Sequence, residues 1–287
     1  MTRWLVTGAA GMLGRDLVAA LATAGQPVTA LTRSDLDVTD RTAVAAAVAE
    51  AAPHAVVNCA AWTAVDEAEA HEDEALLVNG QGAANVAGAC ASSGARLVQI
   101  STDYVFAGDA GRPYPEDAAA RPHTAYGRSK LAGEQAVLAA LPGAAYIVRT
   151  AWLFGAHGPN FVRTMIRLER ERLVVPVVAD QYGQPTWTAQ VAAQVIALVQ
   201  GQAAAGVYHA TSSGQTTWFG LAREIFRLLG ADPDRVTPTT TAAFPRPAPR
   251  PGYSVLGHRA WAAAGIPVIG DWRDGLRQAF PALAALA

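Results

Sequence analysis

A glycine-rich turn near the N-terminus is the feature that most limits how this 287-residue chain can fold. Residues 3–7 form a short apolar segment, the turn 8–14 (GAAGMLG) follows, and apolar positions then recur at helical spacing up to Gly25. In such a strand–turn–helix unit the three glycines permit a tight turn, close approach of a pyrophosphate to backbone amides, and close packing of helix on strand. The spacing is GxxGxxG and not the commoner GxGxxG, and a plain structural turn is the alternative. We expect a dinucleotide to bind at Gly8, Gly11, Met12, Leu13 and Gly14.

Strand and helix patterns alternate through the first 150 residues. Further short apolar strands are expected at 28–31, 55–61, 96–100 and 146–149, with Ala-rich helices between them. This alternation predicts an α/β fold, a doubly wound parallel (Rossmann) sheet with a smaller α/β substrate domain. We expect residues 1–150 plus about 186–204 to form the dinucleotide-binding domain. Residues 151–185 plus about 205–287 would form the substrate domain.

The residues after the second strand bear on cofactor choice. An NAD site usually presents an acid there for the ribose hydroxyl, whereas Arg33 and Ser34 suit a 2′-phosphate. The pattern therefore favours NADPH, with NADH as a weaker alternative. Asp40 or Thr39 is the expected N-cap of the next helix. Further cofactor contacts are expected from Asp37, for which a turn residue is the alternative, and from Val38, Ala60, Ala61 and Thr63.

One lysine stands among 21 arginines, and it lies four residues after a tyrosine in Tyr126-Gly127-Arg128-Ser129-Lys130. On a helix, Tyr126 and Lys130 share one face. An ammonium beside a tyrosine lowers the pKa of the phenol, which suits proton transfer at a carbonyl or alcohol carbon. The alternative is a chance surface pair, since the chain has 7 tyrosines. The spacing makes both residues candidates for catalysis.

Composition excludes several classes of function. The net charge of −2 and the pI near 6.3 give no basic surface for nucleic acid. Cys59 and Cys90 are too few for a disulfide framework or a four-cysteine zinc site, so we expect them to pack as small apolar residues. The sequence has no signal-peptide pattern and no apolar run of membrane-spanning length. We expect a cytoplasmic protein that binds neither nucleic acid nor membrane.

Several motifs together resemble a known family. The glycine turn, Ser101-Thr102 at a strand end and Tyr126-x-x-x-Lys130 resemble the extended short-chain dehydrogenase/reductases. The longer strings 101–106 (STDYVF), 126–134 (YGRSKLAGE), 149–155 (RTAWLFG), 160–161 (NF), 180–186 (DQYGQPT) and 250–256 (RPGYSVL) are similar to the dTDP-4-dehydrorhamnose reductase branch of that family. The resemblance runs from residue 5 to about residue 256.

This resemblance implies NADPH-dependent reduction of the C4 keto group of a dTDP-4-keto-6-deoxyhexose, dTDP-4-dehydrorhamnose to dTDP-L-rhamnose. It implies that Tyr126 is the proton donor, that Lys130 tunes it and holds the nicotinamide ribose, and that Thr102 hydrogen-bonds the substrate oxygen. For Trp152 the alternative to a substrate contact is a core Trp, and for Arg250 it is a solvated loop charge. The substrate contacts expected are Thr102, Asp103, Tyr104, Trp152, Asn160, Gln181 and Arg250.

A shared metal ion is not expected. Some members of the family dimerise through a metal held by acidic side chains. Asp16 could serve at the first position, but 185–190 (PTWTAQ) at the second has no carboxylate. We expect no metal, and a monomer or weak homodimer.

Three other functions remain open. An epimerase or 4,6-dehydratase on this fold is disfavoured, because a dehydratase usually has Asp-Glu after the Thr and this chain has Asp103-Tyr104. A reductase of another deoxyketosugar nucleotide in secondary metabolism differs only in the sugar pocket. A non-catalytic regulatory subunit would tolerate loss of Tyr126 or Lys130, and both are present.

Overall fold

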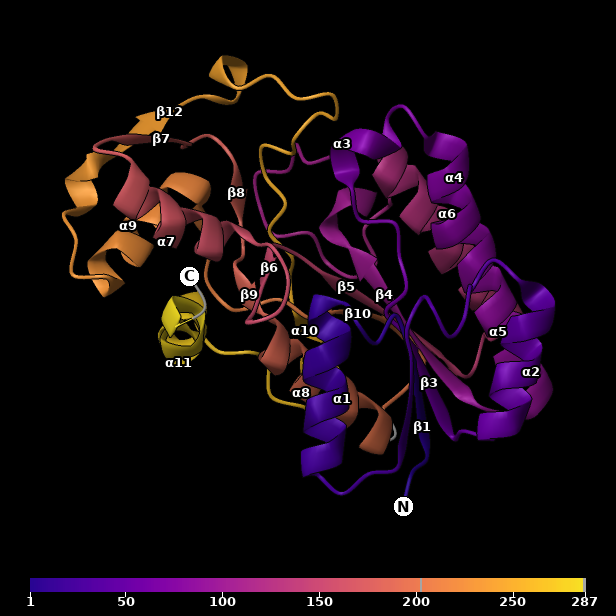
Figure 1. The fold of residues 1–287 in the computed structure, drawn as a ribbon. Coiled ribbons are helices and arrows are strands. Elements are labelled where there is room, and N and C mark those ends of the chain that lie inside the picture. The colour runs from indigo at the N-terminus through magenta and orange to yellow at the C-terminus, as the bar shows by residue number, and fades with distance from the viewer. Residues whose placement is uncertain (202, 286–287) are drawn as a thin grey trace.

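A six-stranded parallel sheet forms the centre of the larger lobe (Figure 1). The computed structural model describes residues 1–201 and 203–285; Gln202, Leu286 and Ala287, which fall within the predicted segments 186–204 and 205–287, lie outside the described residues. In spatial order the strands are β10 (Gly206–His209), β5 (Ala145–Thr150), β4 (Arg96–Thr102), β3 (Ala55–Asn58), β1 (Trp4–Thr7) and β2 (Val28–Leu31). From β1 the chain first adds β2 on one side, and then adds β3, β4, β5 and β10 on the other side. This reversal of strand order between β1 and β3 is that of a doubly wound fold.

Helices cover both faces of this sheet, which explains its continuous apolar strands. Alternate residues of β1 point to opposite sides: Trp4 and Val6 join the core on one face, and Leu5 joins the core on the other. The first face is covered by α1 (Met12–Thr23) and α8 (Thr188–Gln200), and the second by α2 (Arg41–Ala51), α5 (Ala83–Ser93) and α6 (Ala125–Ala140). The predicted fold class is confirmed.

A second lobe has its own apolar core. Three helices and a small parallel strand pair enclose it, with Phe226, Trp272 and Leu276 almost fully buried. Its main elements are α7 (Phe161–Glu171), β7 (Val175–Val178), α9 (Trp218–Leu228), β12 (Val236–Thr239) and α11 (Trp272–Ala285). Figure 1 shows this lobe beside the carboxyl ends of β4 and β5. A cleft between the lobes is the geometric consequence, because each lobe is packed around a separate core.

Short elements connect the two lobes. Two-residue strands pair as β6 (Leu153–Phe154) with β9 (Thr186–Trp187), and β8 (Tyr182–Gly183) with β11 (Thr216–Thr217). The remaining elements are α3 (Val65–Ala68), α4 (Glu72–Leu76), α10 (Arg259–Ala263), a π-helical turn at Leu77–Gly82, and 3-10 turns at Asp103–Val105, Pro233–Arg235 and Thr241–Ala243. No helix within the described ranges is long and apolar enough to cross a membrane.

The chain returns to the large sheet later than its sequence suggests. The predicted helix at about 186–204 is β9 followed by α8, which ends at Gln200. β10 then pairs in parallel with β5, although its residues lie in the segment assigned to the substrate domain. A strand of four residues is too short to show a hydrophobic periodicity in the sequence. This edge strand is therefore defined by its pairing partner. The division into two domains stays a prediction.

Candidate functional site

A cavity of about 1200 Å³ lies where the carboxyl ends of the central strands face the second lobe. Its walls combine the glycine turn, the ends of β2, β3, β4 and β5, the start of α6, and residues of α7, β7 and α9. Open parallel sheets place ligands at this edge. Of the candidate residues, those lining it are Gly8, Gly11, Met12, Leu13, Gly14, Arg33, Asp37, Val38, Ala60, Ala61, Thr63, Thr102, Asp103, Tyr104, Tyr126, Lys130, Trp152, Gln181 and Arg250.

The glycine turn forms one end of the cavity. Gly8 has a φ of +63°, and a Cβ added there would lie 2.5 Å from the amide nitrogen of Ala60. A Cβ on Gly14 would lie 2.4 Å from the carbonyl oxygen of Gly8. The N-cap of α1 is Gly11, whose lack of a side chain leaves the first N–H groups of the helix open to a ligand. This end therefore suits the phosphates of a dinucleotide.

The acids that follow β2 are held in local turns. Asp35 accepts hydrogen bonds from the amide and hydroxyl of Thr32 at 2.9 and 2.6 Å. Asp37 lines the cavity, but its carboxylate accepts from the amide and hydroxyl of Thr39 at 2.9 and 2.8 Å. The Arg33 side chain is exposed and lines the cavity, whereas the Ser34 hydroxyl lies 2.7 Å from that of Thr32 and outside the lining. Arg33 is thus the candidate that faces a ligand.

Asp40 is the N-cap of α2, as the sequence predicts. Its carboxylate accepts from the amides of Thr42 and Ala43 at 2.9 and 3.0 Å. This cap fixes where the loop from β2 ends.

Helix α6 brings Tyr126 and Lys130 to the cavity from one face. Its N-cap Thr124 accepts from the amide of Gly127 at 2.9 Å. A Cβ on Gly127 would lie 2.2 Å from the carbonyl oxygen of Tyr104, so only glycine lets α6 approach the 3-10 turn after β4 this closely. Both side chains are buried, Tyr126 at 9% exposure and Lys130 at 4%. The two residues are not a chance surface pair.

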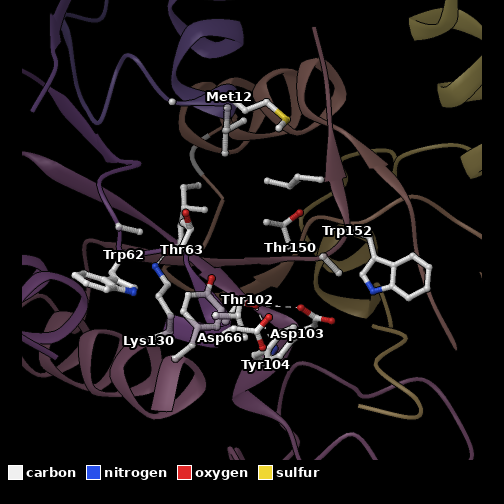
Figure 2. Close-up of a pocket in the computed structure, with 18 of the residues that line it drawn as sticks. Met12, Trp62, Thr63, Asp66, Thr102, Asp103, Tyr104, Lys130, Thr150 and Trp152 are labelled. Carbon is white, nitrogen blue, oxygen red and sulfur yellow. Dashed lines mark hydrogen bonds between the residues drawn. The ribbon is translucent and has the colours of Figure 1, made fainter. Parts of the chain in front are cut away.

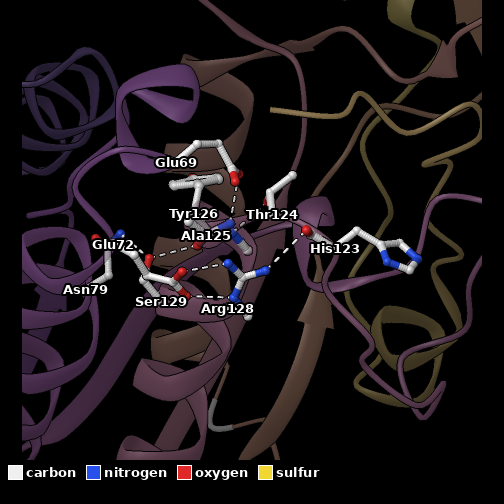
Figure 3. A network of polar contacts seen from close by, with 10 residues as sticks. Glu69, Glu72, Asn79, His123, Thr124, Ala125, Tyr126, Arg128 and Ser129 are labelled. Atoms are coloured by element: carbon white, nitrogen blue, oxygen red, sulfur yellow. Dashed lines mark hydrogen bonds and ion pairs between the residues drawn. The ribbon is translucent and has the colours of Figure 1, made fainter. Parts of the chain in front are cut away.

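Several hydrogen bonds fix the start of α6 to the helices beside it (Figure 3). The Glu69 carboxylate accepts from the amide of Ala125 at 2.9 Å, and Arg128 forms a two-pronged ion pair with Glu72, 2.6 Å at each contact. Asn79, in the π-helical turn, donates to the Ser129 hydroxyl at 2.9 Å. These contacts hold the position of α6, and with it the direction of the Tyr126 side chain.

The pKa of Tyr126 differs from the expectation. Burial raises it to about 12; a hydrogen bond with Thr102 lowers it and the Asp103 charge raises it, both less strongly. The Lys130 ammonium, which donates to the carbonyl oxygen of Ile100 at 2.6 Å, is not among the groups that shift the pKa of Tyr126. Loss of hydration outweighs the expected attraction. Tyr126 therefore stays protonated at neutral pH, as a proton donor must.

Lys130 is held between the sheet and a buried ion pair. Burial lowers the pKa of its ammonium to about 8, while the Glu134 carboxylate one turn later raises it. Glu134 also forms a two-pronged ion pair with Arg149, at 2.9 and 2.7 Å, and accepts from the Ser101 hydroxyl at 2.5 Å. The lone lysine is thus a compact, buried cation at the cavity wall.

Thr102 is the last residue of β4, Asp103 begins the 3-10 turn that follows, and both line the cavity (Figure 2). The Thr102 hydroxyl donates to the Asp103 carboxylate at 3.0 Å. Asp103 is 3% exposed, and burial raises its pKa to about 6. Thr150 Oγ1, at the end of the strand beside β4, has no hydrogen-bond partner among the residues that the structure describes, whereas the Ser254 hydroxyl beside the Asp103 carboxylate lowers its pKa. A buried hydroxyl without a partner in a cavity wall is suited to a hydroxylated ligand.

Trp152 faces the cavity from the side opposite Lys130 (Figure 2). Its ring stacks on Trp218, with centroids 3.5 Å apart and planes 7° from parallel. Its backbone φ is +47°, which is strained for a residue with a side chain. Gly183 leaves room for the indole, because a Cβ there would lie 2.3 Å from it. Trp152 is therefore a fixed aromatic wall.

Two polar candidates are occupied by local contacts. Gln181 lines the cavity, but its amide accepts from Trp218 Nε1 at 3.1 Å and donates to the Thr241 hydroxyl at 2.9 Å. Asn160 lies outside the cavity lining. Its side chain caps α7, accepting from the amide of Arg163 at 3.1 Å and donating to the carbonyl of Gly155 at 2.9 Å. The structure shows the Asn160 side chain as a helix cap, which its position before an apolar run could have indicated, and the expected substrate contact stays a prediction.

Other cavity residues were not found from the sequence. They come mainly from the second lobe and from the loop before α3, and include Trp62, Asp66, Phe161, Met165, Val175, Val177, Trp218, Phe244 and Arg246. Most are apolar positions of amphipathic elements, and the same pattern is typical of core residues. Asp66 could have been found from the sequence, because it is a charged residue close after a strand end.

The two cysteines and Asp16 complete the list of candidates. Both cysteines are free thiols, Cys90 buried and Cys59 in the cavity wall, and burial raises the pKa of each to about 12. Asp16 accepts a hydrogen bond from the Thr188 hydroxyl, and His157 lies 3.8 Å from its carboxylate. Over residues 1–201 and 203–285, no group of three or more His, Cys, Asp or Glu side chains could hold a metal ion.

Comparison with known proteins identifies the family. The model of the RmlD substrate binding domain family matches residues 2–285. A dTDP-4-dehydrorhamnose reductase from Streptomyces griseus is 58% identical, over 99% of this chain and 95% of its own. A dTDP-4-keto-6-deoxy-D-glucose reductase from Streptomyces niveus is 57% identical, over 99% and 98%. The structure of a Bacillus anthracis dTDP-4-dehydrorhamnose reductase in complex with NADP has a TM-score of 0.94 at 40% identity, over 98% and 99% of the two chains. The chain therefore belongs to the RmlD substrate binding domain family, a family of reductases on a Rossmann-like fold.

Proposed function

We propose that this protein is an NADPH-dependent reductase of the C4 keto group of a dTDP-4-keto-6-deoxyhexose. One observation carries the proposal: Tyr126, Lys130 and Thr102 meet at the wall of a cavity whose far end is a glycine cradle. A nicotinamide dinucleotide reaching from that cradle would end beside these three side chains. The larger lobe would hold the cofactor, and the smaller lobe the nucleotide sugar.

The residues at the glycine end support a dinucleotide. Gly8 and Gly14 allow the tight packing, and the open N-terminus of α1 stabilises phosphate charge. Arg33, at the end of β2, would contact the 2′-phosphate. A bound nicotinamide supplies hydride transfer. We infer that NADPH is preferred, because Asp35 and Asp37 are held by Thr32 and Thr39.

Three side chains would act on the keto group. Tyr126, kept protonated by burial, donates its proton to the oxygen that gains negative charge. Thr102 hydrogen-bonds Tyr126 and lies at the strand end beside it, where its hydroxyl would also meet the substrate oxygen. Lys130 provides a positive charge near this oxygen and a donor to the nicotinamide ribose. The ammonium favours the alkoxide-like transition state over the neutral ketone.

The substrate side of the cavity supports a sugar nucleotide. The Trp152 ring would cover the apolar face of a pyranose. Thr150 offers an unpaired hydroxyl, and Asp103 a carboxylate in the same wall, for ring hydroxyls. Arg250 and Arg246 lie in the wall of the same cavity and suit a diphosphate.

The reaction has two candidate substrates, which differ in the sugar. Relatives of nearly equal identity are named dTDP-4-dehydrorhamnose reductase and dTDP-4-keto-6-deoxy-D-glucose reductase. Both names describe reduction of a 4-keto sugar on dTDP. We propose the first, dTDP-4-dehydrorhamnose to dTDP-L-rhamnose, with the second as the alternative.

Purified protein should therefore oxidise NADPH when given dTDP-4-dehydrorhamnose. The test follows NADPH absorbance with this substrate and with dTDP-4-keto-6-deoxy-D-glucose, and identifies each product by NMR. Turnover of only the second substrate selects the alternative. No turnover of either contradicts the proposed reaction and revives a regulatory role.

A further inference from the structure

Residues 240–251, here called the strap, run from β12 of the second lobe to the larger lobe (Figure 1). A carboxylate holds the strap near each end. Asp180 accepts from the amide of Thr241 at 2.9 Å and from its hydroxyl at 2.7 Å. At the far end, Asp66 of α3 accepts from Arg250 at 2.8 Å and from the amide of Ala248 at 3.3 Å. The strap is thus tied to both sides of the cavity.

The far end is the more constrained of the two. Ala248 is fully buried, and Pro251 packs on Gly108 so closely that a Cβ on that glycine would lie 2.3 Å from the Pro251 Cβ. The side chains of Asp66 and Arg250 are 31% and 20% exposed. An ion pair that is this enclosed is screened less than one on an open surface.

The geometry around Arg250 determines where its remaining N–H groups point. One terminal nitrogen donates to Asp66 and the other to the carbonyl of Ala248 at 2.9 Å. These bonds use two of the five N–H groups of a guanidinium and fix the plane of the group. Arg246 also acts on Asp66: burial raises the Asp66 pKa, but the hydrogen bonds and charges of Arg250 and Arg246 lower it overall. All three side chains line the cavity.

We propose that Asp66 is a positioning residue for nucleotide-sugar binding: it fixes Arg250 and the end of the strap so that the free guanidinium N–H groups meet the diphosphate. This inference rests on the proposed function. Asp66 itself would not touch the substrate. A fixed fork binds a diphosphate better than a mobile one, because less side-chain entropy is lost on binding.

The direction in which one substitution changes dTDP binding separates a positioning role from simple neutralisation of Arg250. If Asp66 only neutralised Arg250, removing its charge would free the guanidinium and tighten binding of a dianion. If Asp66 positions Arg250, the same change must weaken binding. Asp66→Asn keeps the size and removes the charge, and Glu67→Gln removes an exposed charge from the next residue as the matched control.

The experiment measures dTDP binding by calorimetry and the kinetics of reduction. We expect Asp66→Asn to raise both the Kd for dTDP and the KM for the dTDP sugar by about tenfold, the effect of one charge-assisted hydrogen bond. The kcat and the KM for NADPH should change little, and Glu67→Gln should match the wild type. Unchanged or tighter dTDP binding by Asp66→Asn would overturn the inference.

Two further measurements isolate the mechanism. In an Arg250→Ala background, Asp66→Asn should add nothing to the loss of dTDP affinity, and additive losses would contradict action through Arg250. Amide hydrogen exchange of ligand-free protein should be faster at residues 244–250 in Asp66→Asn; unchanged exchange there contradicts anchoring of the strap. Asp66-dependent dTDP binding without turnover would refute only the proposed reaction, whereas a wild-type protein that does not bind dTDP would refute both.

Discussion

The two sides of the cavity are built in different ways. The cofactor side is made largely of backbone: Gly8, Gly11 and Gly14 within one turn, and the first amides of α1. The substrate side is made of side chains from separate segments, such as Trp152, Gln181, Trp218 and Arg250. A phosphate needs N–H groups and space, which one turn can supply, whereas a sugar nucleotide needs several polar and aromatic groups at set distances.

This difference affects how each side tolerates change. On the cofactor side, a Cβ at Gly14 would lie 2.4 Å from a backbone oxygen, so a substitution there has no room. On the substrate side, polar groups already bind one another, as Gln181 does with Trp218 and Thr241. Tyr126 and Lys130, the proposed catalytic pair, lie at the junction of the two sides, and the predictions below start there.

The largest effect is expected from Tyr126→Phe. Loss of the proton donor should lower kcat by about 10²- to 10⁴-fold, while NADPH binding is kept. Stopped-flow or steady-state NADPH oxidation measures it. Tyr146→Phe, which removes a hydroxyl that donates to Ala203 in the sheet core, is the control and should keep its turnover. A Tyr126→Phe variant with more than about a tenth of wild-type kcat would show that another group donates the proton.

Lys130→Arg should be nearly as damaging despite its conserved charge. The ammonium is 4% exposed and donates to Ile100 at 2.6 Å, so a guanidinium cannot occupy the same space. We expect kcat/KM to fall by at least about tenfold, with a smaller loss of thermal stability. Arg277→Lys, at an exposed position of α11 in the second lobe, is the control. Equal rates for wild type and Lys130→Arg would mean that the compact charge is not needed.

The Asp103 carboxylate should lower the stability of the folded protein and contribute to sugar binding. Its pKa is raised to about 6 in the folded protein, so its cost to stability is absent at low pH and grows as pH rises through this value. Asp103→Asn should therefore raise the free energy of unfolding by about 1–3 kcal/mol at pH 7.5 and much less at pH 4.5. It should also weaken sugar binding. Denaturant titrations at the two pH values test this, and a pH-independent difference would contradict it.

Cofactor preference tests the cofactor side alone. We expect kcat/KM to be about tenfold higher with NADPH than with NADH. Arg33→Ala should reduce this difference by raising the KM for NADPH. Arg33 is exposed, so higher salt should reduce the preference. Arg41→Ala, an exposed charge at the start of α2, is the control. Equal use of both cofactors by the wild type would contradict the role of Arg33.

The smallest effect is expected at Asn160, whose side chain caps α7. Asn160→Ala should cost about 1 kcal/mol of stability, and Asn160→Asp should cost less, since it keeps the cap and loses the hydrogen bond to the Gly155 carbonyl. Neither should alter the KM for the dTDP sugar. Thermal unfolding and kinetics measure both. A raised KM in Asn160→Asp without loss of stability would return Asn160 to the substrate site.

Local sequence signals predicted much of the fold and one side of the site. The glycine turn, the cap at Asp40 and the Tyr126–Lys130 spacing each act over a few residues, where backbone geometry decides the outcome. Other features were missed because they depend on partners far along the chain. β10 belongs to the large sheet only through its pairing with β5, and Trp218 reaches the cavity only by stacking on Trp152.

The sequence by itself indicated the residues that we propose to carry the chemistry: a glycine turn for phosphates, and one tyrosine and one lysine on a shared helix face. The tertiary structure alone decided their environment. Burial, and not the nearby ammonium, controls the pKa of Tyr126, and Arg250 is fixed by a carboxylate 184 residues earlier in the chain. Residue type and spacing are local properties, whereas hydration and long-range pairing exist only once the lobes have packed.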